Sequence, residues 1–230
     1  MKVYEIKVKV YLLEKLFAED ALGKIAYYID STLTKSKEWS TFHSKNEFKL
    51  YTFNNLYPLS ADKVYEADRN YTFIVRTVDS NLAHYFNEQL GSQRTKELVG
   101  LNTEVRIVPK KKIYKLHTLT PVIVKSDKGY WRNSMTLEEY EERLKVNVIK
   151  KYNQFMKKKV DESFTLYTHL LFKNSVPIKC PIKSVHLLGD KLEIEVGTSD
   201  LAQDFAYFLL GVSLGEMGSR GYGYLNYVWY

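Results

Sequence analysis

A glycine-rich segment near the C-terminus carries the clearest chemical signal in the sequence. Four glycines fall within nine residues between Gly215 and Gly223, with Arg220 among them. Glycine accepts positive φ and lets backbone N–H groups approach a phosphate, while arginine adds a planar cation. The candidate phosphate ligands are Gly215, Gly218, Ser219, Arg220, Gly221 and Gly223. A tight turn from a helix to a strand, which needs glycine only for its geometry, is the alternative.

A second group of chemically capable residues precedes a predicted strand in the first half of the chain. His43 stands alone there, and Lys49 follows six residues later. Histidine titrates near pH ~6.5 and can therefore give or take a proton, while lysine supplies positive charge. A surface histidine in a polar loop and a solvated lysine are the alternatives, and Lys45 competes for the role of the cation.

The remaining histidines do not suggest a metal centre. His84, His117, His169 and His186 show no metal-ligand spacing, and no cluster of acidic residues suggests a two-metal nuclease. We therefore expect no metal and no cofactor.

The glycine-rich segment resembles the C-terminal loop of the CRISPR-associated repeat-processing endoribonucleases, within the repeat-associated RNA-binding superfamily. The family pattern is Gly-apolar-Gly, five residues, then Gly-apolar-Gly. The chain reads Ser213-Leu214-Gly215, five residues, then Gly221-Tyr222-Gly223, so Ser213 departs from the first glycine. Only this segment matches at the level of a motif, whereas the likeness in overall organisation covers the whole chain.

The resemblance implies an active site. In this family a tyrosine, a histidine and a lysine with similar spacing form the active site of several members. These roles fall on Tyr28, His43 and Lys49. The implied reaction is metal-independent cleavage of precursor CRISPR RNA within its repeats, in which the 2′-hydroxyl attacks the adjacent phosphate. The products would be a 2′,3′-cyclic phosphate and a 5′-hydroxyl.

The chemistry explains why such residue types are needed. One group must take the proton of the 2′-hydroxyl, another must protonate the leaving oxygen, and a cation must stabilise the phosphorane. The division of acid and base roles between His43 and Tyr28 stays open. A non-catalytic RNA-binding subunit of a CRISPR interference complex is the alternative function, because it would need the same fold and loop but not His43.

Charge and composition favour a nucleic-acid partner. The 230 residues include 34 Lys and Arg against 27 Asp and Glu, and the net charge of +7 suits a polyanion. The run Lys110, Lys111 and Lys112 lies at the expected junction of two halves, where RNA could bind. Lys7, Lys9 and Tyr11 share one face of the first strand. A solvated surface is the alternative for both groups.

The single cysteine, Cys180, excludes an internal disulfide and a thiolate cluster. No apolar run reaches the ~20 residues of a membrane span, and the N-terminus lacks a signal core. We therefore expect a cytoplasmic protein with no membrane partner. The resemblance implies a role in antiviral defence and CRISPR repeat RNA, as precursor and processed crRNA, as the partner. Other subunits of an interference complex and a homodimer stay open as further partners.

The elements that must position these residues follow a β-α-β-β-α-β order in the first half. Residues 3–12 alternate as a half-buried strand, and residues 20–33 carry an apolar helical stripe. Strands are expected at 48–57, 63–78 and 98–108, and a helix begins after Asp79. This is the order of a ferredoxin-like unit.

The second half repeats that order. The expected strands are residues 114–124, 182–188, 191–196 and 222–229, with a hairpin turn at Gly189-Asp190. Helices begin at the capping box of Thr136 and after Ser199, and residues 159–178 read as an insertion. We expect an α+β protein of two tandem ferredoxin-like (RRM-like) domains packed together. Residues 1–112 would carry the active site and residues 113–230 the glycine-rich loop.

Overall fold

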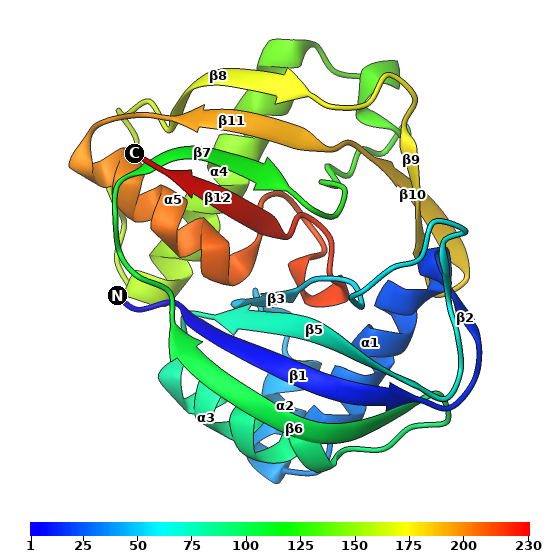
Figure 1. Ribbon diagram of the computed structural model, residues 1–230. Coiled ribbons are helices and arrows are strands. Elements are labelled where there is room, and N and C mark those ends of the chain that lie inside the picture. The colour runs from blue at the N-terminus through cyan, green and yellow to red at the C-terminus, as the bar shows by residue number, and fades with distance from the viewer.

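Two antiparallel sheets of four strands organise the chain in the computed structural model, which describes residues 1–230. The strand orders are β3-β5-β1-β6 and β12-β7-β11-β8, and helices back each sheet (Figure 1). When the four strands of each sheet are numbered in chain order, the first strand lies between the third and the fourth in both sheets. This is the ferredoxin-like arrangement, so the expected α+β fold is confirmed.

The first half supplies one sheet with its helices and a short two-stranded ribbon. Its elements are β1 (Tyr4–Leu12), β2 (Leu16–Phe17), α1 (Ala18–Leu33), α2 (Lys37–Ser44), β3 (Tyr51–Phe53), β4 (Val64–Tyr65), β5 (Arg69–Thr77), α3 (Ser80–Gln89), η1 (Leu90–Ser92) and β6 (Leu98–Ile107). Alternation in β1 buries Ile6, Val8 and Val10 under the helices and leaves Lys7 and Lys9 exposed.

Two expectations for the first half were wrong. Residues 37–44 form helix α2, which sequence reasoning missed because this short segment buries only Trp39 and so carries no apolar stripe. The expected strand 63–78 is broken, because Asp68 has a φ of 60° and separates β4 from β5.

The second half supplies the other sheet. Its elements are β7 (Ile113–Thr118), η2 (Trp131–Asn133), α4 (Leu137–Met156), β8 (Tyr167–Phe172), β9 (Ile178–Ile182), β10 (Val185–Gly189), β11 (Leu192–Val196), α5 (Asp200–Val212), η3 (Gly218–Arg220) and β12 (Leu225–Trp229). Thr136 and Glu139 form the expected capping box of α4. None of the helices in either half combines the length and the apolar character that a membrane span requires.

The expected hairpin of the second half was placed wrongly. β9 pairs with β10 around Lys183 and Ser184, whereas β11 joins the main sheet between β7 and β8. Strand β8, within the residues expected to be an insertion, is therefore the second strand of the ferredoxin-like unit. Asp190 does not form the turn, because its carboxylate accepts hydrogen bonds from Tyr130 and Trp131 in the interior.

The two halves are joined by buried polar contacts as well as apolar packing. Arg76 on β5 is 3% exposed; its guanidinium pairs with Glu5 at 2.7 Å and donates to the carbonyl of Leu225 at 2.7 Å. The Gln154 side chain of α4 bonds both backbone groups of Phe48. The Gln154 contact holds the connection between α2 and β3 against the second half, and the candidate site lies beside this connection.

Candidate active site

The glycine-rich loop between α5 and β12 is packed between the two halves. Gly221 has a φ of +84°, and a Cβ there would lie 2.7 Å from side-chain atoms of both Leu22 and Phe53. The loop therefore needs glycine to reach the core of the first half, and not only to form a turn. The other glycines expected to bind phosphate are also buried: Gly215, Gly218 and Gly223. A Cβ at any of the four would meet protein atoms at less than 3.0 Å, so each position has a packing reason for glycine, and Gly218 also lines the cleft described below.

Lys151 of α4 holds the loop from inside the protein. It is 4% exposed, and its ammonium group donates to the carbonyls of Ser213 at 3.1 Å and Gly215 at 2.5 Å. Burial lowers its pKa to about 7, although the carboxylate of Glu216 opposes this shift. A buried lysine with carbonyl partners fixes the path of the loop by satisfying its backbone acceptors.

The partly exposed residues of the loop include Ser219 and Arg220, and Arg220 points toward the first half. Its guanidinium donates to Oδ2 of Asp30, in the last turn of α1. The other oxygen, Oδ1, lies 3.6 Å from Nδ1 of His43, in the last turn of α2. Arg220, Asp30 and His43 thus come together from three elements, and each side chain remains partly exposed.

Lys49 lies in the same region. Its ammonium group donates to the carbonyls of Phe42, at 2.7 Å, and Lys45, which closes the end of α2. Burial lowers its pKa, and the positive charges of Arg220 and Lys45 act in the same direction, while Glu47 and Asp30 oppose them. An ammonium with two backbone partners keeps one N–H for a ligand. Lys49 bonds the carbonyl of the residue before His43, and the charges of Arg220 and Asp30 act on it, so the structure brings His43, Lys49 and Arg220 into one region.

Tyr28 is not with them. Its side chain is fully buried, and its hydroxyl donates to the carbonyl of Leu90 and, at 3.2 Å, to that of Gln93. Burial raises its pKa above the usual tyrosine range. This side of α1 packs on the sheet, with Phe73 against the Tyr28 ring, so the structure does not bring Tyr28 to His43 and Lys49. The residue of α1 that approaches His43 is Asp30.

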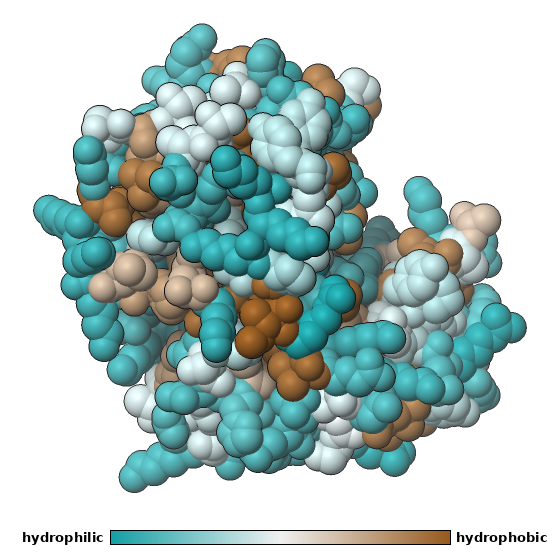
Figure 2. Space-filling view, turned by 60° about the vertical axis from the view of Figure 1, so that its left-hand side comes forward, coloured by the Kyte–Doolittle hydropathy of each residue, from teal (hydrophilic) through white to brown (hydrophobic).

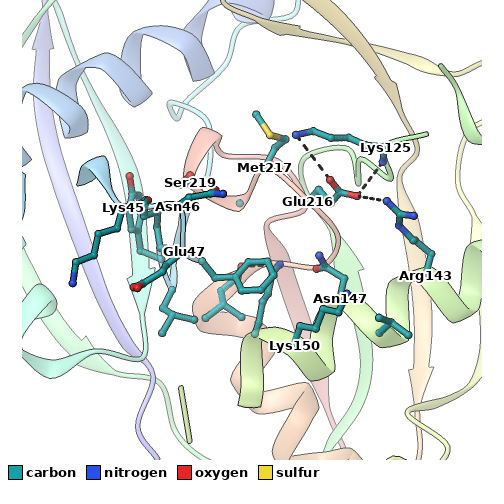
Figure 3. Close-up of a pocket in the computed structure, with 18 of the residues that line it drawn as sticks. Lys45, Asn46, Glu47, Lys125, Arg143, Asn147, Lys150, Glu216, Met217 and Ser219 are labelled. Atoms are coloured by element: carbon teal, nitrogen blue, oxygen red, sulfur yellow. Dashed lines mark hydrogen bonds and ion pairs between the residues drawn. The ribbon is translucent and has the colours of Figure 1, made fainter. Parts of the chain in front are cut away.

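An open cleft runs from Lys45 and Lys49 along the loop to α4. It has a volume of about 1010 Å³ and lies between the segment 45–51, the loop and the N-terminal part of α4. Figure 3 shows Glu216 of the loop held by Lys125 and Arg143, with Lys150 further along α4. The lining mixes both signs of charge, with Glu138, Glu139 and Glu142 of α4 among the lysines and Arg143.

The lysine run between the two halves lies elsewhere. Lys110 pairs with Asp204 at 2.6 Å, and Lys111 and Lys112 are exposed on the connection between β6 and β7. This connection runs along the side of the molecule where the chain termini lie, which is turned forward in Figure 2 and is largely hydrophilic (Figures 1 and 2). The three lysines line neither the cleft nor the cavity of about 630 Å³ on the other side of Arg220.

Sequence reasoning missed two residues of the site, and each carried a signal. Asp30 is an acidic residue in the last turn of a helix, where the helix dipole disfavours negative charge. Lys151 lies on the apolar stripe of α4, seven residues after Leu144 and three after Val148. A charge in either position costs stability unless the tertiary structure supplies a partner.

The side chains of His, Cys, Asp and Glu form no group of three that could hold a metal ion.

Residues 101–227 match the family model described as CRISPR associated protein Cas6, C-terminal. The match includes the whole glycine-rich loop and covers more than half of the chain. This chain belongs to the Cas6 family. The resemblance of the loop, which rested on its glycine spacing, is confirmed. No curated protein matches the sequence.

Solved structures of Cas6 and RAMP proteins share the fold over nearly the full length of the chain. A RAMP protein described as binding different RNA substrates is 17% identical, with a TM-score of 0.72, covering 98% of this chain and 99% of that one. A Cas6-related protein from Pyrococcus furiosus is 12% identical, with a TM-score of 0.68 and 98% coverage of both chains. A Cas6 product complex is 13% identical, with a TM-score of 0.62 and 99% coverage of both. At these identities the likeness shows the common fold.

Proposed function

We propose that this Cas6 protein is a metal-independent endoribonuclease that cleaves precursor CRISPR RNA within its repeats. The observation that carries the proposal is the convergence of His43, Lys49 and Arg220 at the junction of the two halves. Residues 1–112 would form the domain that supplies His43 and Lys49, and residues 113–230 the domain that supplies the loop. The Cas6 product complex and the RAMP protein that binds RNA support the choice of substrate.

The proposed reaction is a transfer within the RNA. The 2′-hydroxyl loses its proton and its oxygen bonds to the adjacent phosphorus, while the bond from phosphorus to the 5′ oxygen breaks and that oxygen is protonated. His43 carries out one of the two proton transfers, because imidazole can give or accept a proton near neutral pH. The third N–H of Lys49 and the guanidinium of Arg220 stabilise the negative charge of the phosphorane. Lys45 is exposed beside Lys49 and is the competing cation.

The RNA would lie along the cleft, whose lining includes Lys49 and Ser219 but not His43 or Arg220. Lys45 and Lys150 line its two sides near the loop, and both are exposed. Ser219 at the edge of the loop offers a hydroxyl to the phosphate backbone. The binding part of the loop would then be its partly exposed residues, Ser219 and Arg220, held in place by the buried glycines. CRISPR repeat RNA, as precursor and product, is the proposed ligand.

The test is cleavage of a labelled repeat RNA in excess EDTA. The cut site is first mapped with the wild-type protein, and a second substrate then carries a single 2′-deoxy sugar on the 5′ side of that cut. The variants are His43→Ala and the matched control His84→Ala, whose side chain is 74% exposed on α3 and pairs only with Glu88. Mass spectrometry of the products identifies their ends.

We expect one cut in EDTA with a 2′,3′-cyclic phosphate, no cleavage of the deoxy substrate, and normal cleavage by His84→Ala. His43→Ala should bind the RNA as the wild type does and cleave it at least about a hundredfold more slowly. Loss of all cleavage in EDTA would refute the metal-independent mechanism. Tight binding without any cleavage by the wild type would favour the alternative, a non-catalytic RNA-binding subunit of an interference complex.

A further inference from the structure

Asp30 occupies a position that the proposed reaction does not yet use. Its carboxylate lies between the cation of Arg220 and the ring of His43, and each oxygen faces one of them. The oxygen that faces Arg220 accepts a hydrogen bond from the guanidinium. The oxygen that faces His43, Oδ1, is buried and has no hydrogen-bond partner. A buried carboxylate oxygen without a donor is unfavourable, so this oxygen requires a donor close by.

The nearest donor is Nδ1 of His43. The separation of 3.6 Å is within ion-pair range but longer than a hydrogen bond. Catalytic hydrogen bonds are often long in a free enzyme and shorten when the substrate is bound. A small rotation of the His43 ring toward Asp30 would satisfy Oδ1 without moving either helix. The side chain of His43 is only partly buried, which leaves room for this rotation.

We propose that Asp30 is the positioning residue of His43, an inference that rests on the proposed function. A carboxylate that accepts from Nδ1–H fixes the imidazole tautomer, so that Nε2 on the opposite edge of the ring is free to exchange a proton with the RNA. When His43 carries two protons, Asp30 stabilises the imidazolium and stays ionised itself. This holds whether His43 is the base or the acid. Arg220 orients the carboxylate by donating to its other oxygen.

The contact also links catalysis to the assembly of the two halves. Asp30 lies on α1 and His43 on α2, both in the first half, while Arg220 comes from the loop of the second half. Lys151 and the buried Gly221 hold that loop in place. Because Arg220 fixes one carboxylate oxygen, the other can point only toward His43. The glycine-rich loop thus orients the proton-transfer group through Asp30, in addition to any contact of its own with RNA.

The experiment compares wild type, Asp30→Asn and the matched control Glu38→Gln, which removes an exposed carboxylate from α2. Long-range ¹H–¹⁵N spectra of the free protein, recorded well above the ordinary histidine pKa of about 6.5, report the tautomer of each histidine. The protein has five histidines, and the signals of His43 are those that disappear in His43→Ala. Single-turnover cleavage and RNA affinity are measured on the same variants.

In the wild type we expect the His43 proton on Nδ1, and in Asp30→Asn a shift toward the tautomer with the proton on Nε2. The cleavage rate of Asp30→Asn should fall about a hundredfold or more, with RNA affinity within about threefold of wild type. Glu38→Gln should match the wild type in both measurements. The proposal is overturned if wild-type His43 carries its proton on Nε2, or if Asp30→Asn cleaves at the wild-type rate. Should the wild type not cleave RNA at all, the proposed function fails, and the tautomer of wild-type His43 still decides the role of Asp30.

Discussion

Replacing one buried glycine of the loop tests how the two halves fit together. Gly221→Ala places a methyl group 2.7 Å from side-chain atoms of Leu22 and Phe53, at a φ of +84°. Gly129→Ala is a matched control, because Gly129 has a φ of +88° and no atom would lie within 4 Å of its Cβ. Both substitutions therefore carry the same backbone penalty, of about 1–2 kcal/mol, and the same change in the unfolded chain.

The difference between the two variants isolates the packing term. Forcing an extra methyl group into a packed core costs about 1–3 kcal/mol. For a domain of this size each 1 kcal/mol corresponds to about 2–4 °C in melting temperature. We therefore expect Gly221→Ala to melt about 2–12 °C below Gly129→Ala.

Thermal unfolding followed by circular dichroism measures this difference, and cleavage of repeat RNA gives a second readout. Gly221 follows Arg220 directly, so displacing the loop should also slow cleavage by Gly221→Ala but not by Gly129→Ala. Equal melting temperatures for the two variants would refute the packing of the loop against Leu22 and Phe53.

Two further substitutions test the buried polar groups. Burial lowers the pKa of Lys151 from 10.5 to about 7, so between these pH values the unfolded chain binds more protons than the folded one. Urea titrations at several pH values measure the free energy of unfolding. The value for the wild type should rise with pH relative to that of Lys151→Met, by at most about 1.4 kcal/mol per pH unit. A difference that does not change with pH would mean that the lysine stays protonated in the folded protein. Tyr28→Phe removes a hydroxyl that donates to Leu90 and Gln93, and should lower the free energy of unfolding by about 1–2 kcal/mol in the same titrations while the cleavage rate stays within threefold. A cleavage rate of Tyr28→Phe that is tenfold below that of the wild type would mean that Tyr28 belongs to the active site.

The periodic parts of the fold could be predicted from the sequence because their signals are local. Alternation in β1 and the apolar stripe of α1 are set by residues a few positions apart, and so is the capping box at Thr136. Strand pairing is not local. The partner of β10 is β9, on its N-terminal side, while Gly189-Asp190 offered an equally good turn to β11. The tertiary structure excludes that alternative, because β11 pairs with β7 and β8, and the carboxylate of Asp190 accepts hydrogen bonds from Tyr130 and Trp131.

The candidate site, like the fold, has parts that local sequence signals predict and parts that they do not. The sequence by itself identified the glycine-rich loop, and the family to which it points, because the spacing of glycines is a property of one segment. It also singled out His43 and Lys49 as residues able to do the chemistry. Whether a side chain on α1 faces the core or the cleft depends on a rotation of a single residue, which is about 100° of helix.

Tertiary structure alone therefore decided that Tyr28 is buried and that Asp30 meets His43. It also decided that Gly221 packs against the first half, and that Arg220 reaches Asp30 in the same half. These facts depend on residues far apart in the chain, such as Arg220 and Asp30 at a separation of 190 positions, which no local pattern connects. The sequence alone identifies residue types that could catalyse the reaction. That these residues lie close together in space follows from how the two ferredoxin-like halves pack.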